Sequence, residues 1–399
     1  MHAALEALFH RSVMSALVAF ALTLGVVMLL SPLARRLGWV DRPGGRKTHA
    51  VATPVVGGLA MLLGSIPLAI TTFQLTPNLL GLMVGGAIVI AAGVWDDVKD
   101  LRWYWRLMAQ AAAALAMVYV GGVRVEMIGP LFGAHVESLG FLSVPFTVVA
   151  TIGIMNALNM ADGIDGLAGT LTAAALLMLT AAAVYSGNQR LAHGLVLLLG
   201  AVLAFLAFNL RSPWMPKASI FLGNAGSEFL GLVIAWACFR LTQNGAHPVT
   251  PALAPFLIAP PVIDCLVLMV RRMRNGRSPF AADRNHFHHL LLDARWTTTT
   301  AVLLIGAISL ALGLGAALAL KAHIKPIYLV VAFAGITLWY YAVSARRADC
   351  VAFLRGLGSA LGALEPPPPA APEAGAGRHA PNRSLGADPV MSRIPRDKL

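Results

Sequence analysis

The chain has 399 residues, of which 58% are hydrophobic and 12% are charged, and its mean hydropathy is +0.73. A soluble protein carries charge on about a quarter of its residues, so this composition excludes a soluble protein and indicates an integral membrane protein. The net charge of +12 would suggest nucleic acid as the partner of a soluble protein. Between membrane spans it instead indicates anionic lipids and anionic substrates, and no nucleic acid is expected.

Windows of about 19 residues find eleven apolar segments, which predict transmembrane helices. The predicted fold class is therefore all-α, a polytopic bundle of about eleven transmembrane helices.

Lys and Arg are distributed unevenly between the two sides of this bundle. With the N-terminus outside, the inner loops and the tail carry 24 of the 30 basic residues, and the outer side carries five. Positive residues collect on the cytoplasmic side of membrane proteins. We therefore expect the N-terminus outside and the C-terminus in the cytoplasm.

The first inner loop contains the polar stretch DRPGGRKTH, residues 41–49. Lys47 could meet a phosphate, with the paired glycines letting the backbone come close. On charge alone, the stretch is equally typical of a basic membrane anchor.

Three carboxylates follow the third predicted span, in the stretch GVWDDVKDL. Asp96 and Asp100, four residues apart, share a helix face, as do Asp97 and Asp100, three apart. Together they could hold a divalent cation or a magnesium-bound phosphate. A carboxylate at the edge of the hydrocarbon is costly and so indicates function. The alternative is a solvated loop with Lys99 and Arg102 as partners.

A second polar stretch, NALNMADGIDGLA, ends the fifth predicted span. Its amides and carboxylates recur every three residues, which stacks them along one side of a helix. They are Asn156, Asn159, Asp162 and Asp165. Gly163 and Gly166 predict a helix break that leaves N–H groups free for an anion or a base. The spacing and the terminal Glu of a calcium-binding EF-hand loop are missing.

Two further inner loops carry candidate binding residues. In IFLGNAGS, residues 220–227, Phe221 could stack on a base and the glycines would admit a phosphate. The loop 271–299 brings arginines, which match phosphate oxygens, and the histidines His286, His288 and His289. Anion binding is favoured there over a metal site, because cysteines are missing, and over a lipid-facing basic anchor.

From Glu365 the chain is rich in Pro, Ala and Gly, a composition that cannot bury a core. We therefore predict a membrane catalytic domain over residues 1–348 and a cytoplasmic tail over 349–399, disordered from 365.

Carboxylates, amides, cationic groups and glycines thus come to one predicted face of the bundle. This inventory suits phosphoryl transfer from a soluble, nucleotide-linked donor to a lipid-borne acceptor.

The motifs together resemble the polyprenyl-phosphate N-acetylhexosamine-1-phosphate transferase family. The resemblance covers residues 41–58, 93–101, 156–168, 221–227 and 278–292. The stretch ADRNHFHH, residues 282–289, is similar to the branch that uses UDP-N-acetylglucosamine with undecaprenyl phosphate, and less similar to the muramoyl-pentapeptide branch.

The resemblance implies transfer of N-acetylhexosamine 1-phosphate from a UDP-sugar to undecaprenyl phosphate, with release of UMP. This would be the first step of lipid-linked cell-surface polysaccharide synthesis, in the inner membrane of a bacterium. It also implies Mg²⁺ as cofactor, with Mn²⁺ as a substitute, and allows a homodimer.

The same resemblance gives each site residue an expected role. Asp96 would be the base or the nucleophile, and Asp97 its metal-linked neighbour. Lys47, Asn159 and Asp162 would hold diphosphate and metal. Asp165 and Phe221 would hold the uridine. Asn156 joins the substrate-binding set. The sugar-phosphate side would be bound by Arg284, His286, His288 and His289.

Asn224 is one departure from the family pattern, which usually has Asp at this metal-binding position. An amide oxygen can still bind Mg²⁺ but carries no charge, so we expect an active enzyme with an altered metal site. The competing function is an intramembrane prenyltransferase, because residues 96–100 also match the DDxxD pattern of prenyl-diphosphate sites. A transporter is the third alternative.

Overall fold

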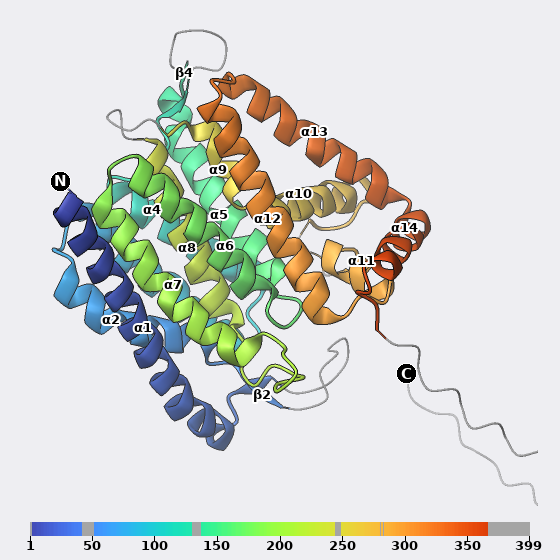
Figure 1. Cartoon of the computed structure of the whole chain (residues 1–399), viewed down its shortest axis with the longest axis horizontal. Coiled ribbons are helices and arrows are strands. Elements are labelled where there is room, and N and C mark those ends of the chain that lie inside the picture. The colour runs from blue at the N-terminus through green and yellow to red at the C-terminus, as the bar shows by residue number, and fades with distance from the viewer. Residues whose placement is uncertain are drawn as a thin grey trace, which may run out of the picture. The chain divides into compact units, whose positions relative to one another are not determined.

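The computed structural model describes residues 2–41, 52–129, 137–243, 249–279, 281 and 283–365 (Figure 1). Side chains are described from His10 onward. The α-helices are α1 (His2–Leu37), α2 (Gly57–Thr72), α3 (Pro77–Lys99), α4 (Trp103–Tyr119), α5 (Ser143–Ala161), α6 (Leu167–Tyr185), α7 (Gln189–Asn209), α8 (Gly223–Thr242), α9 (Ala254–Leu257), α10 (Ala259–Arg274), α11 (Phe287–Asp293), α12 (Thr298–Lys321), α13 (Pro326–Ala345) and α14 (Arg347–Ala360). Two short antiparallel ribbons join β1 (Val40–Asp41) to β2 (Thr53–Pro54) and β3 (Met127–Gly129) to β4 (Glu137–Ser138).

The all-α prediction is confirmed. In the described part of the chain, eight helices are long and apolar enough to cross a membrane, and a bent pair would make nine. Apolar helix α2 has only 16 residues, about 24 Å at the usual rise of about 1.5 Å per residue. The count of eleven spans therefore stays a prediction.

The predicted span 250–270 is not one straight helix, because the chain turns by 85° between Leu257 and Ala259. Pro260 and Pro261 explain the break. Within a helix, a proline ring clashes with the carbonyl four residues earlier. The first turn of a helix tolerates proline, and both prolines lie in the first turn of α10.

Helix α8 lies between α3 and α5, and glycines let these helices approach closely. A Cβ on Gly93 of α3 would collide with the backbone of Ala225, and one on Gly58 of α2 would collide with that of Gly226. Small residues at helix contacts are typical of membrane bundles. They bring the ends of α2 and α3 against the first turn of α8, where the polar motifs lie.

Helix α14 is part of the compact unit, which extends to Leu364, beyond the predicted domain boundary at residue 348. In Figure 1, α14 lies beside α11, and the two helices are in contact. Its Cys350 and Leu354 are buried. Disorder is predicted from residue 365 onward, and the residues after 365 lie outside the described part of the chain.

Candidate functional site

Asp97, in the last turn of α3, caps the first turn of α8. Its Oδ1 accepts a hydrogen bond from the backbone N–H of Asn224 at 2.8 Å, and its Oδ2 one from Ala225 at 3.4 Å. The first N–H groups of a helix lack partners within the helix and carry its partial positive charge. Gly223 makes this approach possible, since it has φ +78° and a Cβ there would lie 2.6 Å from Oδ2 of Asp97.

Asp96 is buried and faces the loop that follows α3. Its Oδ1 accepts from the backbone N–H of Leu101 at 2.6 Å, and its Oδ2 pairs with the Arg106 guanidinium at 3.3 Å. Asp100 ends the helix in the left-handed conformation, with φ 50°, and is exposed. The three carboxylates therefore separate: Asp97 points to α8, Asp96 to Arg106, and Asp100 lies on the surface.

The two asparagines at the end of α5 make different contacts, Asn159 with α8 and Asn156 with Gln110 of α4. Nδ2 of Asn159 donates to Oδ1 of Asn224 at 2.8 Å and to Oγ of Ser227 at 2.9 Å. Asn156 donates to Gln110 at 2.6 Å, and Gln110 donates to the buried Glu228 at 2.9 Å. Asn159 thus joins the Asn224 site, whereas Asn156 belongs to a polar network between helices.

The break after α5, predicted from its glycines, places Asp162 and Asp165 in a loop between α5 and α6. Asp165 accepts from Nε of Arg211 at 2.7 Å and from the backbone N–H of Ala218 at 3.2 Å, both at Oδ2. Burial, with the nearby carboxylates of Asp97 and Asp165, raises the pKa of Asp162 well above its usual value. The negative charges of Asp97 and Asp165 therefore both favour the protonated form of Asp162.

Asn209, at the end of α7, fixes this loop against the segment before α8. Its Oδ1 accepts from the backbone N–H of Gly166 at 2.7 Å, and its Nδ2 donates to the carbonyl of Ile220 at 2.9 Å. Phe221, the predicted base-stacking residue, is half-buried and continues this segment, with its backbone paired to Pro54 and Gly57. The sequence analysis missed Asn209, although an Asn buried at the end of an apolar run is a usable signal.

Histidines of α11 pack directly on this loop. A Cβ on Gly163 would lie 2.5 Å from Nε2 of His288. The rings of His288 and His289 are 4.2 Å apart, and Nε2 of His288 and Nδ1 of His289 are buried without a hydrogen-bond partner in the described part of the chain. Burial, then the charges of His289 and His286, lower the pKa of His288 well below its usual value. Burial, then the charge of His286, lowers that of His289 to about 4. Both rings are therefore neutral near pH 7.

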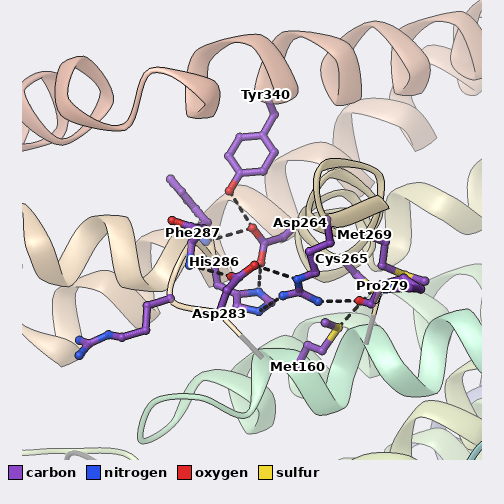
Figure 2. Close-up of polar contacts among 12 residues, drawn as sticks. Met160, Asp264, Cys265, Met269, Pro279, Asp283, His286, Phe287 and Tyr340 are labelled. Atoms are coloured by element: carbon purple, nitrogen blue, oxygen red, sulfur yellow. Dashed lines mark hydrogen bonds and ion pairs between the residues drawn. The ribbon is translucent and has the colours of Figure 1, made fainter. Parts of the chain in front are cut away.

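His286 is held by residues that the sequence analysis did not select (Figure 2). Asp264 of α10 accepts from Nδ1 of His286 at 2.7 Å, and its other oxygen accepts from the backbone N–H of Phe287 at 3.0 Å and from the Tyr340 hydroxyl at 2.7 Å. Nη2 of Arg272 lies 3.5 Å from Nε2 of His286. Both ring nitrogens thus face protein groups, and His286 orients the start of α11.

Arg272 fixes the preceding part of the same loop. It is 3% exposed, pairs with Asp283 at 2.8 Å and donates to the carbonyl of Pro279 at 2.8 Å (Figure 2). Burial alone would raise the pKa of Asp283, but the hydrogen bonds from Arg272 and from the backbone of Asn285 lower it. Arg284 follows and is exposed.

The structure thus brings together the ends of α3 and α5, the start of α8 and the histidines of α11. From the predicted site these are Asp97, Asn159, Asp162, Asp165, Asn224, His288 and His289. Asp96 lies beside Asp97 but faces Arg106, while Asn156 and His286 make contacts within the protein. Lys47 lies outside the described residues.

The oxygen atoms of Asp97, Asp162 and Asn224 are of the kind that Mg²⁺ prefers as ligands. Asp97 and Asp162 are carboxylates whose charges repel, and neither pairs with a Lys or Arg among the described residues. Asn224 adds an amide oxygen that accepts one hydrogen bond, from Asn159. No group of three or more His, Cys, Asp or Glu in the described residues could hold a metal alone. Mg²⁺ usually takes one or two carboxylates and completes its shell with water and substrate phosphates.

Comparisons with known proteins identify the family of the chain. Residues 79–242, which contain the ends of α3 and α5 and the start of α8, match the model of "Glycosyl transferase family 4". Three relatives carry the name "Undecaprenyl-phosphate alpha-N-acetylglucosaminyl 1-phosphate transferase". The chain is 32% identical to the one from Yersinia pestis over 72% of this chain and 78% of the relative, and 31% identical to that of Escherichia coli K12 over 80% and 87%. It is 34% identical to the one from Haemophilus influenzae over 71% and 80%.

Proposed function

The chain belongs to glycosyl transferase family 4, and from this premise we propose that it transfers N-acetylglucosamine 1-phosphate from UDP-N-acetylglucosamine to undecaprenyl phosphate, releasing UMP. This reaction would start the synthesis of a lipid-linked cell-surface polysaccharide. Its substrates are inferred from the names of the relatives and from the chemistry of the site.

One observation carries the proposal. Carboxylates of α3 and of the α5–α6 loop, the first turn of α8 and two neutral histidines of α11 meet in one place. A diphosphate needs hydrogen-bond donors and charge neutralisation. Transfer of its sugar-bearing phosphoryl group needs mainly positioning and electrostatic stabilisation from the protein.

The transfer exchanges one P–O bond for another. An oxygen of the lipid phosphate attacks the phosphorus that carries the sugar, and the bond from that phosphorus to the oxygen of UMP breaks. The electron pair leaves with UMP, and the product is a polyprenyl diphosphate sugar. We propose that Asp96 accepts the proton of the lipid phosphate. Its alternative role is that of a nucleophile that attacks the phosphorus directly. Arg106, 3.3 Å from Asp96, would place a cation beside the incoming phosphate.

The donor would lie along the loops that Asn209 joins. Asp165 uses Oδ2 for both Arg211 and Ala218, so its other oxygen would accept from the uracil ring, with Phe221 stacking on it. Lys47 would add a cation to the diphosphate. His288 and His289 would donate or accept with the unpartnered nitrogens on the sugar-phosphate side. Arg284 would lie at the outer edge of the same side.

Mg²⁺ would be held by Asp97, Asp162 and Asn224, with Mn²⁺ as a substitute. When bound, the cation would neutralise the diphosphate and favour departure of UMP. The raised pKa of Asp162 supports this assignment, because carboxylates that repel one another are a natural place for a divalent cation.

The protein would lie in the inner membrane of a bacterium as a multi-pass protein, with the N-terminus outside and the site on the cytoplasmic face, where nucleotide sugars are found. The excess of basic residues on the predicted inner side supports this orientation. A homodimer is compatible with the reaction, which needs only one chain per site.

Purified membranes containing the chain test the proposal. We expect UMP release from UDP-N-acetylglucosamine only when polyprenyl phosphate and Mg²⁺ are both present. Release that ignores the lipid acceptor, or that persists in Asp96→Asn, would contradict it. The prenyltransferase alternative predicts inorganic diphosphate release from a prenyl diphosphate and an aromatic acceptor, so the same membranes are assayed for that product.

A further inference from the structure

The histidine segment, residues 284–293, is held from two sides. On one side, Asp264 of α10 binds His286 and the backbone of Phe287. On the other side lies α14, which follows the last candidate membrane span and is far from the histidines in sequence. The α10 contacts fix the start of α11, but they do not reach its last residue.

Arg347, the first residue of α14, contacts both ends of the histidine segment. Nη1 donates to the carbonyl oxygen of Arg284 at 2.9 Å and to Oδ1 of Asn285 at 2.5 Å. Nη2 pairs with Asp293, the last residue of α11. A guanidinium offers several donors in one rigid plane, so a single side chain sets the distance between the two ends.

Directed hydrogen bonds carry this contact more than charge does. The side chains of Arg347 and Asp293 are 41% and 34% exposed, so water and salt screen their attraction. A lysine could keep the ion pair with Asp293, but one ammonium cannot reproduce the planar fork that also reaches Arg284 and Asn285.

Helix α14 is attached to the bundle without the help of Arg347. Nε1 of Trp296 donates to the carbonyl oxygen of Leu354 at 2.8 Å. The carbonyl oxygen of Ala363 accepts from the backbone N–H of Thr297 at 3.1 Å and from the Thr300 hydroxyl at 3.0 Å. Replacing Arg347 should therefore leave α14 in place and loosen only the histidine segment.

We propose that Arg347 is a positioning residue for the transfer reaction, and that α14 is thereby a working part of the enzyme. By fixing both ends of α11, it aims the unpartnered nitrogens of His288 and His289 at the sugar-phosphate side. The inference rests on the proposed function, since it needs a nucleotide sugar to lie against these two histidines.

The test compares Arg347→Met with Arg346→Met in the full-length chain. Arg346 is adjacent and exposed, and its side chain makes no polar contact in the described part of the structure, so both variants lose one positive charge. We expect kcat/KM for UDP-N-acetylglucosamine to fall about tenfold to a hundredfold in Arg347→Met only, as for other residues that orient a reacting group. The KM for polyprenyl phosphate should not change. Equal losses in the two variants would overturn the proposal.

Two further variants separate positioning from folding. Arg347→Ala should regain part of its activity when millimolar guanidinium is added. Arg347→Lys should be less active than wild type. An Arg347→Ala protein that melts normally, is impaired, and gains nothing from guanidinium would contradict the proposal.

Hydrogen exchange gives an answer that does not depend on activity. In Arg347→Met, amides of residues 284–293 should exchange faster, whereas those of 350–360 should keep their protection. Unchanged exchange in the histidine segment would refute the positioning role even if the proposed function held. A wild-type chain that releases no UMP would instead refute the proposed function and leave the exchange result standing.

Discussion

The Oδ1 atom of Asp97 lies 2.8 Å from the backbone nitrogen of Asn224, so a carboxylate at the end of α3 caps the start of α8. This contact joins two motifs 127 residues apart. It places the predicted metal-linked carboxylate and the residue that departs from the family pattern in one small site.

Replacing Asp97 by Asn should separate folding from catalysis. The Asn side-chain oxygen can still cap α8, so thermal stability in detergent should stay within about 1 kcal/mol of wild type, the usual scale of a cap. The lost charge should lower kcat at least about a hundredfold, as losses of electrostatic stabilisation do. UMP release and a melting curve on one preparation check both parts, and near-normal turnover would remove Asp97 from the site.

The Asn224→Asp variant tests the altered metal site. The new carboxylate would still accept from Asn159 and would add a negative charge beside Asp97 and Asp162. Apparent Mg²⁺ affinity, measured by titrating the metal in the UMP assay, should rise about threefold to tenfold, equivalent to about 1 kcal/mol. Asn224→Gln, which keeps the charge unchanged, is the control. An unchanged or lower affinity in Asn224→Asp would count against the assignment.

Asp162→Asn should make the metal-free protein more stable while abolishing activity. Burial and the charges of Asp97 and Asp165 raise the pKa of Asp162 in the folded state. The folded protein then holds this proton more tightly than the unfolded chain, whose Asp has a pKa near about 4. Stability is therefore lost as pH rises from the unfolded pKa through the folded one.

Asparagine imitates the neutral form of Asp162 and avoids that loss. Without Mg²⁺ at pH 7.5, we expect the melting temperature of Asp162→Asn to exceed that of wild type by about 2 °C. The difference should shrink at pH 5 and when Mg²⁺ is added to wild type. A variant that melts below wild type at pH 7.5 would show that Asp162 stabilises the fold instead.

Gly163→Ala should displace His288, which packs against Gly163. The added Cβ would lie 2.5 Å from Nε2 of His288, so the ring or the loop must shift. Because a displacement of about 1 Å can cost on the order of a hundredfold, kcat should fall by about tenfold or more. Gly153→Ala on α5 is the matched control, since its Cβ would meet nothing within 4 Å. Equal activity of the two variants would place His288 away from the reaction.

Asp264→Asn should uncouple His286 from α10. An amide has only one acceptor oxygen, so it could accept from Nδ1 of His286 or from the Phe287 N–H and the Tyr340 hydroxyl, but not from both sides. We expect a loss of kcat/KM of about tenfold to a hundredfold, typical of residues that orient a functional group. Tyr340→Phe removes only the hydroxyl bond to the same carboxylate, worth about 1 kcal/mol, and should cost less. A larger loss in Tyr340→Phe would reverse this order of importance.

Local chemistry in the sequence was enough to predict the class of fold and to select several of the polar residues that the structure brings together. A chain with 12% charged residues must bury its helices in lipid or in one another, which decides the all-α architecture. Asp97, Asn159 and Asp162 could be selected because polar groups at the ends of apolar spans are too costly to lack a purpose. The glycines of the α5–α6 loop likewise predicted the break that the structure has.

The tertiary structure decided which of these groups meet and what holds them. Asp264 binds His286 across 22 residues, and Arg347 reaches Arg284 across 63. Such contacts depend on how helices bend and pack, which no local pattern encodes. The turn of 85° before α10 is an example, because a run of apolar residues looks the same whether it crosses the membrane or turns within it. For the same reason the packing of α14 against α11 could not be predicted, and the sequence placed most of α14 in the tail.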